Sequence, residues 1–168
     1  MRLALTGLIA ATLLTAQMAA AAPCANPIDQ GAFDIAGLKS QLMVTALSCN
    51  MRDQYNRVVV RFRPDLMREE RALNSYFTRV YGRRARQAHD DYITSLANTQ
   101  SEAGVQRGNL FCREHIALFG SVLALRSGGE LVSFAAHQEG PQPMTLVSCS
   151  TRPPVRRGSG YTRTAQAR

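Results

Sequence analysis

Four cysteines lie far apart in the chain, and no two of them form a CxxC motif; they are Cys24, Cys49, Cys112 and Cys149. Their spacing matches neither a haem-attachment signature nor a paired zinc-ligand pattern. In an exported protein, an even number of dispersed cysteines predicts two disulfides. Three pairings are possible, and we favour Cys49 with Cys112, which would join two helices. Cys24 with Cys149 would then tie the two ends of the domain together.

Residues 1–21 have the layout of a secretory signal peptide, with a basic start, an apolar run and an alanine-rich end. The apolar run over residues 3–14 is shorter than the roughly 20 residues that a transmembrane helix needs. Cleavage near Ala21 would satisfy the preference for small residues at the processing site. Pro23 stands directly before Cys24, which disfavours lipid attachment there. We therefore expect a periplasmic or secreted protein with no transmembrane segment in the mature chain.

Apolar residues recur at helical spacing in four segments of the mature chain. The first segment covers residues 35–62, with Asp34 as its N-cap, and follows an irregular lead-in. The second follows Pro64, because proline is tolerated at the first position of a helix, and stops at Gly82. Both segments have one apolar side and one polar side, which is typical of helices that cover a core.

The third predicted helix covers residues 83–103, and the fourth covers residues 109–125. The fourth is apolar over half of its circumference, so we expect it to be the most buried helix. A short fifth helix is possible over residues 130–138, and residues 144–147 look extended. The prediction is an all-α, antiparallel four-helix bundle-like domain over residues 22–149, stabilised by two disulfides.

The net charge of +8 is concentrated in two parts of the chain. Residues 50–86 hold ten arginines and four acids, and residues 150–168 hold five arginines and no acid. The second part has no apolar period, so we predict a disordered, basic C-terminal tail over residues 150–168. Arginine far outnumbers lysine, which fits either phosphate binding or a GC-rich genome.

A basic surface of this kind can attract anionic partners, such as lipopolysaccharide, anionic phospholipid or nucleic acid. Tyrosines are interspersed among the arginines, and aromatic residues also contact such polymers. The alternative is an ordinary solvated helix face. The possible anion-binding residues are Arg52, Arg57, Arg61, Arg63, Arg83, Arg84, Arg86, Arg156 and Arg157.

Histidines and nucleophiles form no recognisable catalytic or metal-binding constellation in the sequence. His89 has acidic neighbours at 90 and 91, but adjacent helical residues do not share a face, so we expect a solvated helix edge. His115 lies on an apolar stripe, where a core histidine is expected, and His137 lies near an irregular segment. Ser159 lacks the strand-to-helix turn of a nucleophile elbow. We therefore predict no catalytic, metal-binding or cofactor-binding residue.

Four short segments carry a resemblance to a known group of proteins. They are LSCN at 47–50, QYN at 54–56, DYIT at 91–94 and FC at 111–112. In these segments the chain resembles a group of small exported helical proteins from alphaproteobacteria. No activity is known for the proteins of that group. The resemblance covers residues 38–125. It implies an export signal and a helical fold, and it brings no ligand or catalytic residue.

Three functional hypotheses follow from the sequence. The leading hypothesis is a non-enzymatic periplasmic or secreted protein that binds another protein or a component of the cell envelope. The second is an anion-binding module that uses the arginine-rich helix surface and the tail. The third is a small enzyme of unfamiliar type, because helical bundles can build sites from residues distant in the sequence.

Overall fold

The computed structural model describes residues 24–149, which form an all-α domain. The helices are α1 (Pro27–Ser48), α2 (Arg52–Arg61), α3 (Arg63–Tyr81), α4 (Ala85–Arg107), α5 (Asn109–Ala124) and α6 (Gly128–Ala136), with a 3₁₀ turn η1 (Gly82–Arg84) between α3 and α4. The predicted all-α class and the short fifth predicted helix, which is α6, are confirmed. The predicted signal peptide and basic tail lie outside the described residues. None of the helices within 24–149 is long and apolar enough to cross a membrane.

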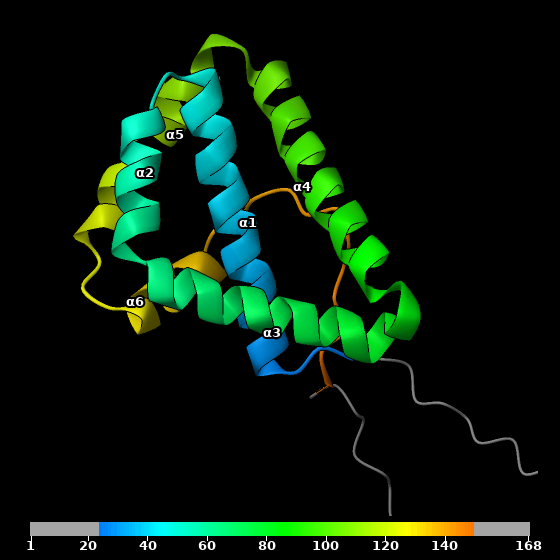
Figure 1. Cartoon of the computed structure of the whole chain (residues 1–168). Coiled ribbons are helices and arrows are strands. Elements are labelled where there is room, and N and C mark those ends of the chain that lie inside the picture. The colour runs from blue at the N-terminus through cyan, green and yellow to red at the C-terminus, as the bar shows by residue number, and fades with distance from the viewer. Residues whose placement is uncertain (1–23, 150–168) are drawn as a thin grey trace, which may run out of the picture.

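Helix α1 is the centre of the domain, and every other α-helix packs against it (Figure 1). Two neighbours, α2 and α5, lie on one side of α1 together with α6, while α4 lies on the other side and α3 crosses its lower end. The expectation that residues 109–125 form the most buried helix is wrong. Most of α1 is buried, whereas α5 leaves Leu110 and Ile116 exposed. The reason is that α1 has few charged residues around its circumference, and such a helix is stable only inside.

The hydrophobic core consists of two clusters, and α1 contributes to both. The first cluster joins α1 to α2, α5 and α6 through residues such as Leu42, Phe119 and Leu131. The second joins α1 to α3 and α4 and contains a group of aromatic rings around Phe33 and Phe77. Because one helix supplies both clusters, the two halves of the domain cannot separate without exposing it.

The start of α1 differs from the prediction. The helix begins at Pro27, and its N-cap is Asn26 rather than Asp34, so the predicted irregular lead-in is largely helical. The Asn26 side chain accepts hydrogen bonds from two backbone N–H groups of the first turn, at 2.9 and 3.0 Å. Asp29 in turn accepts from the Asn26 backbone N–H at 2.8 Å. This reciprocal capping box, with proline in the first turn, fixes where the helix starts.

The predicted single helix over residues 35–62 is wrong, because the chain turns at residues 49–51 and divides it into α1 and α2. Asn50 has a φ of 57°. Asparagine is one of the few non-glycine residues that adopt this left-handed conformation readily. The turn folds α2 back along α1 (Figure 1). The next break, before Pro64, is confirmed: α2 ends at Arg61, and Pro64 lies in the first turn of α3.

Both predicted disulfides are present. Cys49 at the end of α1 is bonded to Cys112 in α5, with Cα atoms 5.6 Å apart. Cys24 is bonded to Cys149, with Cα atoms 4.9 Å apart. Next to this second disulfide, Ala25 and Ser148 form a short parallel bridge, in which the Ala25 N–H donates to the carbonyl of residue 147. The predicted extended segment therefore brings the end of the described chain back to its beginning.

Candidate ligand-binding groove

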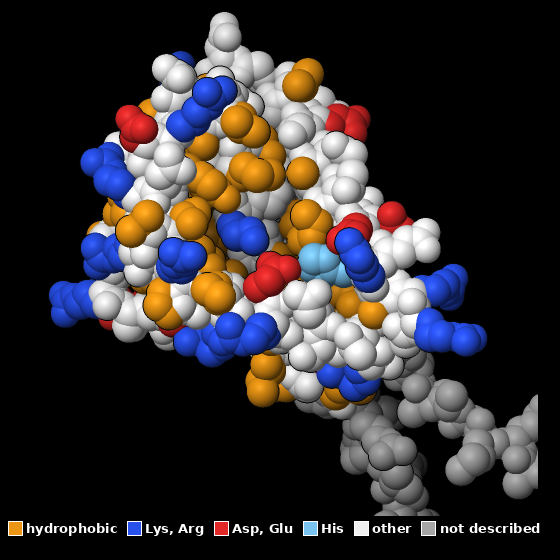
Figure 2. Space-filling model, in the orientation of Figure 1, with side chains coloured by type: hydrophobic (Ala, Val, Ile, Leu, Met, Phe, Trp, Pro, Cys, Tyr) orange, Lys and Arg blue, Asp and Glu red, His pale blue; other side chains and the backbone are white. Residues whose placement is uncertain are grey.

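One line of residues on α1 is left partly uncovered by the other helices. Lys39 and Met43 are half-buried and Leu47 is 60 % exposed, whereas their neighbours on most other sides are buried. Residues spaced by four share one face of a helix. Figure 2 shows hydrophobic side chains on the floor of a hollow between α2 and α4, in front of α1.

An open groove of about 640 Å³ begins at the Lys39 end of this line, and we call it the α1–α2–α3 groove. Its lining residues are Lys39 from α1, Tyr55 and Val59 from α2, and Arg63, Leu66, Met67, Glu70 and Arg71 from α3. The volume is in the range of ligand-binding sites in proteins. The groove therefore has the size of a binding site, and its walls combine apolar and basic side chains.

The floor of the groove is tightly packed. Beneath it lie Leu42, Val58 and Leu131 from three helices, together with Ile35 and Leu38, and the space among them is only about 10 Å³. A ligand of this groove would consequently lie on its surface, because the core below has no room for it.

Two arginines in the groove have no acidic partner. Arg63 and Arg71 form no ion pair with any residue of the described chain. Glu70, the one acid of the groove, is already bonded: the Lys39 ammonium donates to it at 3.4 Å, and His89 Nε2 lies 3.1 Å from its other oxygen. The groove therefore presents two unpaired guanidinium groups beside apolar side chains.

Tyr55 adds a neutral polar group to the wall of the groove. A tyrosine phenol is protonated at neutral pH, and burial raises the pKa of Tyr55 further above its ordinary value. Its hydroxyl has no hydrogen-bond partner among residues 24–149, and it is free to donate to a ligand.

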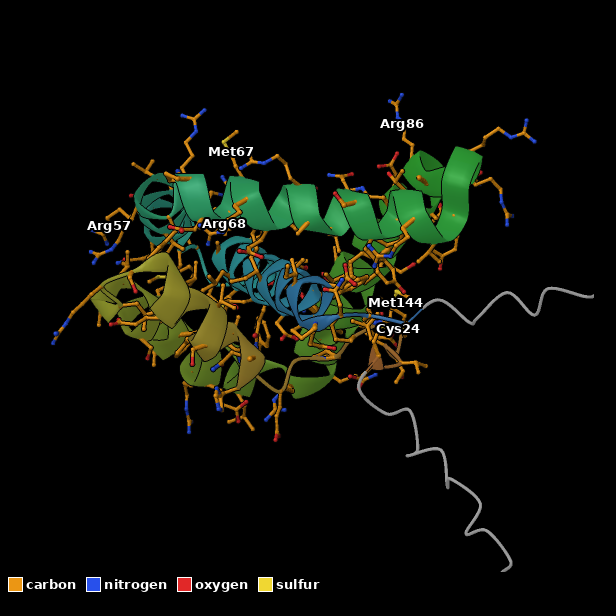
Figure 3. All side chains as sticks on the ribbon, turned by 90° about the horizontal axis from the view of Figure 1, so that it is seen from below. Cys24, Arg57, Met67, Arg68, Arg86 and Met144 are labelled. Atoms are coloured by element: carbon orange, nitrogen blue, oxygen red, sulfur yellow. A yellow bond between two sulfur atoms is a disulfide. The ribbon has the colours of Figure 1, made fainter. Side chains whose placement is uncertain are left out.

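The predicted anion-binding arginines do not form one surface. Arg57 and Arg86 lie near opposite ends of α3, as Figure 3 shows. The α3 helix has 19 residues, so its ends are roughly 28 Å apart. Arg61 is used internally, because its Nη2 donates to the Leu125 carbonyl at 2.6 Å. The remaining candidates divide between the α2 end (Arg52, Arg57, Arg63) and the η1 end (Arg83, Arg84, Arg86), and Arg156 and Arg157 lie outside the described residues.

Of the predicted anion-binding residues, only Arg63 lines the groove. The other two basic residues of the groove, Lys39 and Arg71, are not among those predicted from the sequence. The only sequence signal was the order of residues on α3. Positions 63, 66, 67, 70 and 71 repeat at i, i+3, i+4, i+7 and i+8, which places them on one helix face. Nothing in the sequence indicates that α2 leaves this face open.

His89 is not the solvated edge residue that the sequence predicts. Its side chain is only 15 % exposed, packs edge-on against Phe77 and contacts Glu70, so it joins α4 to α3. The acids that follow it are exposed.

The other two histidines bond within their own helices. His115 Nδ1 donates to the Phe111 carbonyl at 2.9 Å, and the two rings stack. His137 Nδ1 donates to the Ser133 carbonyl at the end of α6. Within the described part of the chain, no three His, Cys, Asp or Glu side chains lie close enough together to hold a metal ion.

A second, smaller cavity lies between α1, α4 and α5. Its volume is about 80 Å³, and Gln100, Phe111 and His115 are among its lining residues. The Gln100 amide nitrogen donates to the Gly37 carbonyl at 3.1 Å, while its buried oxygen has no partner. A space of this size admits a few water molecules rather than a metabolite. The α1–α2–α3 groove is therefore the stronger candidate site.

The groove supplies groups for binding: apolar surface, three cations, a phenol and a carboxylate that is already bonded. Comparison with known proteins found no match to the chain, either among protein-family models, among curated proteins or among solved structures. The function is therefore inferred from the geometry of the groove.

Proposed function

We propose that this chain is an exported, non-enzymatic binding protein and that the α1–α2–α3 groove is its binding surface. The observation that carries the proposal is the pair of unpaired guanidinium groups, of Arg63 and Arg71, beside the apolar side chains of Leu66 and Met67. Two disulfides support export, because such bonds persist in the periplasm or outside the cell and are rare in the cytosol. The resemblance to small exported proteins of alphaproteobacteria agrees with this proposal.

A ligand that suits this groove has both apolar and anionic parts. Apolar contact with Val59, Leu66 and Met67 would remove hydrophobic surface from water, which is worth roughly 25 cal/mol per Å². Anionic groups would pair with guanidinium groups that have no internal partner to give up. The cost of breaking existing ion pairs is therefore small.

The proposal can be tested with the fluorescent probe 8-anilino-1-naphthalenesulfonate, which combines an apolar ring system with one anionic group. We expect one probe molecule to bind per folded chain. The variant Arg63→Glu/Arg71→Glu should weaken binding about tenfold or more, which corresponds to about 1.4 kcal/mol. The chain has no tryptophan, so probe fluorescence is read without interference from that residue.

The matched control is Arg83→Glu/Arg84→Glu, which makes the same change in net charge outside the groove. We expect this control to bind the probe nearly as well as the parent chain. Equal weakening by both variants, or no binding to the folded parent, would show that the groove is not a specific site. A circular dichroism spectrum of each variant verifies that the helices are retained.

Binding of polyanions, such as lipopolysaccharide or nucleic acid, is the second candidate. It is favoured by the exposed arginines at both ends of α3, since Arg57, Arg83 and Arg84 form no ion pair with a described residue. Such binding weakens steeply with salt because counterions are released. Retention on heparin that depends on Arg83 and Arg84 but not on Arg63 and Arg71 would favour this candidate over the groove.

A further inference from the structure

The α3 wall of the groove carries basic residues on both sides of an apolar pair. Arg63 is followed by Leu66 and Met67, and then by Glu70 and Arg71, so all five lie on one face of the helix, and the Glu70 carboxylate is already bonded within the domain. Arg71 is eight positions after Arg63, which corresponds to about 12 Å along the helix. A guanidinium group therefore stands at each end of a short apolar surface.

We infer that the occupant of the α1–α2–α3 groove is an acidic amphipathic helix of a partner protein; this inference rests on the function proposed above. A helix laid along the groove needs carboxylates seven or eight residues apart, to meet Arg63 and Arg71. Between them it needs apolar residues at i+3 and i+4, to cover Leu66 and Met67. Docking of an amphipathic helix in an apolar groove is a recurring form of protein recognition.

The apolar surface continues beyond the groove along α1. Lys39 lines the groove, and Met43 and Leu47 follow it on the same face of α1, over about 12 Å. Figure 2 shows this hollow open at the front of the molecule. Because α3 crosses α1 (Figure 1), this apolar line leads away from the α3 wall at an angle, and a helix laid along Arg63 and Arg71 would contact it only at its Lys39 end.

A lipid with one acyl chain fits the groove less well. Such a ligand has a single charged end and requires an enclosed apolar channel for the rest, since pockets for small ligands cover most of the ligand surface. The α3 wall of this groove has a cation at each end, and the free space beneath the floor of the groove is only about 10 Å³. Met67 is 52 % exposed and projects outward from α3 (Figure 3), where a flexible side chain can adapt to a partner surface.

The test is site-specific photo-crosslinking in the cells that naturally make the protein. The photoreactive residue p-benzoylphenylalanine replaces Met67 in the full chain, and the control carries it at Val105, which is 80 % exposed at the far end of α4. We expect a discrete protein adduct at position 67 only. The adduct should disappear in Arg63→Glu/Arg71→Glu and persist in Arg83→Glu/Arg84→Glu.

Peptide mapping of the adduct then identifies the occupant. We expect a segment with carboxylates seven or eight residues apart and apolar residues between them, and replacing those carboxylates by lysine should restore the adduct of Arg63→Glu/Arg71→Glu. A lipid adduct, or a protein segment without such acids, would show that the occupant is not an acidic helix. The groove would still be a binding surface in that case. If no adduct specific to position 67 forms, both the proposed partner helix and the proposed function are wrong.

Discussion

Asp29 and Arg79 are 50 residues apart in the chain and form an ion pair of 2.6 Å between α1 and α3. The Asp29 side chain is only 4 % exposed, while that of Arg79 is 48 % exposed. The same Asp29 oxygen accepts the backbone N–H of Asn26, so one carboxylate serves both the cap of α1 and the contact with α3. This pair couples the start of the central helix to the helix that crosses it.

Replacing Asp29 should therefore destabilise the whole domain. We expect Asp29→Ala to lower the free energy of unfolding by about 3 kcal/mol, because it removes a buried ion pair and half of a capping box. The comparison is Arg107→Ala, which breaks the pair with Glu114 in which both side chains are exposed, and it should cost much less than Asp29→Ala. Urea denaturation measures both values. Similar losses in the two variants would contradict this account.

The disulfide between α1 and α5 should contribute strongly to stability. Cys49 and Cys112 are 63 residues apart, and closing a loop of that length is worth roughly 4 kcal/mol in the chain-entropy model. We expect Cys49→Ser/Cys112→Ser to lose most of that amount in thermal or urea denaturation. Unreduced protein should also be lighter by four hydrogens than fully reduced protein in mass spectrometry. Free thiols in the unreduced protein would refute both disulfides.

The turn between α1 and α2 should depend on the backbone conformation of Asn50. With a φ of 57°, this residue occupies a region where a Cβ is unfavourable. We expect Asn50→Ala to cost about 1 kcal/mol, and Asn50→Gly to be neutral or slightly stabilising. Unfolding curves of the two variants provide the measurement. If alanine and glycine have equal effects, the left-handed conformation does not determine the turn.

Alkaline pH should weaken the domain through Tyr92. Burial, with a smaller contribution from the charge of Asp34, raises the pKa of the Tyr92 phenol in the folded state. Above pH of about 10 the unfolded chain loses this proton while the folded chain keeps it, so stability falls as the pH rises. Tyr92→Phe loses the 3.1 Å hydrogen bond to Gln142, worth about 1 kcal/mol at neutral pH.

The test of this pH dependence compares urea denaturation of Tyr92→Phe and the parent chain at pH 8 and pH 11. Stability of the variant should decrease less between the two pH values. A residual decrease is expected, because burial also raises the pKa of Tyr55 and Tyr76. Parallel decreases in the two proteins would show that Tyr92 does not contribute.

The sequence predicted the helical segments and the presence of two disulfides, because periodicity and cysteine count are simple signals, and the favoured pairing among the three possible ones is the one that the structure has. It missed the turn at Asn50, because the apolar period continues across it. It also missed the capping box at Asn26, because Gly31 interrupts the apolar pattern there. The groove could not be predicted at all: Lys39, Tyr55 and Arg71 lie on three helices, and only the packing of these helices around α1 brings them together.

The Cys24–Cys149 bond also determines how the domain would respond to mechanical force. Its two Cα atoms are 4.9 Å apart, so tension applied at residues 24 and 149 passes through the covalent bond and not through the helices. Cutting this bond alone would release only the residues outside the inner Cys49–Cys112 loop, a length of roughly 200 Å when fully extended. The central residues 50–111 would extend only after the inner bond was also cut.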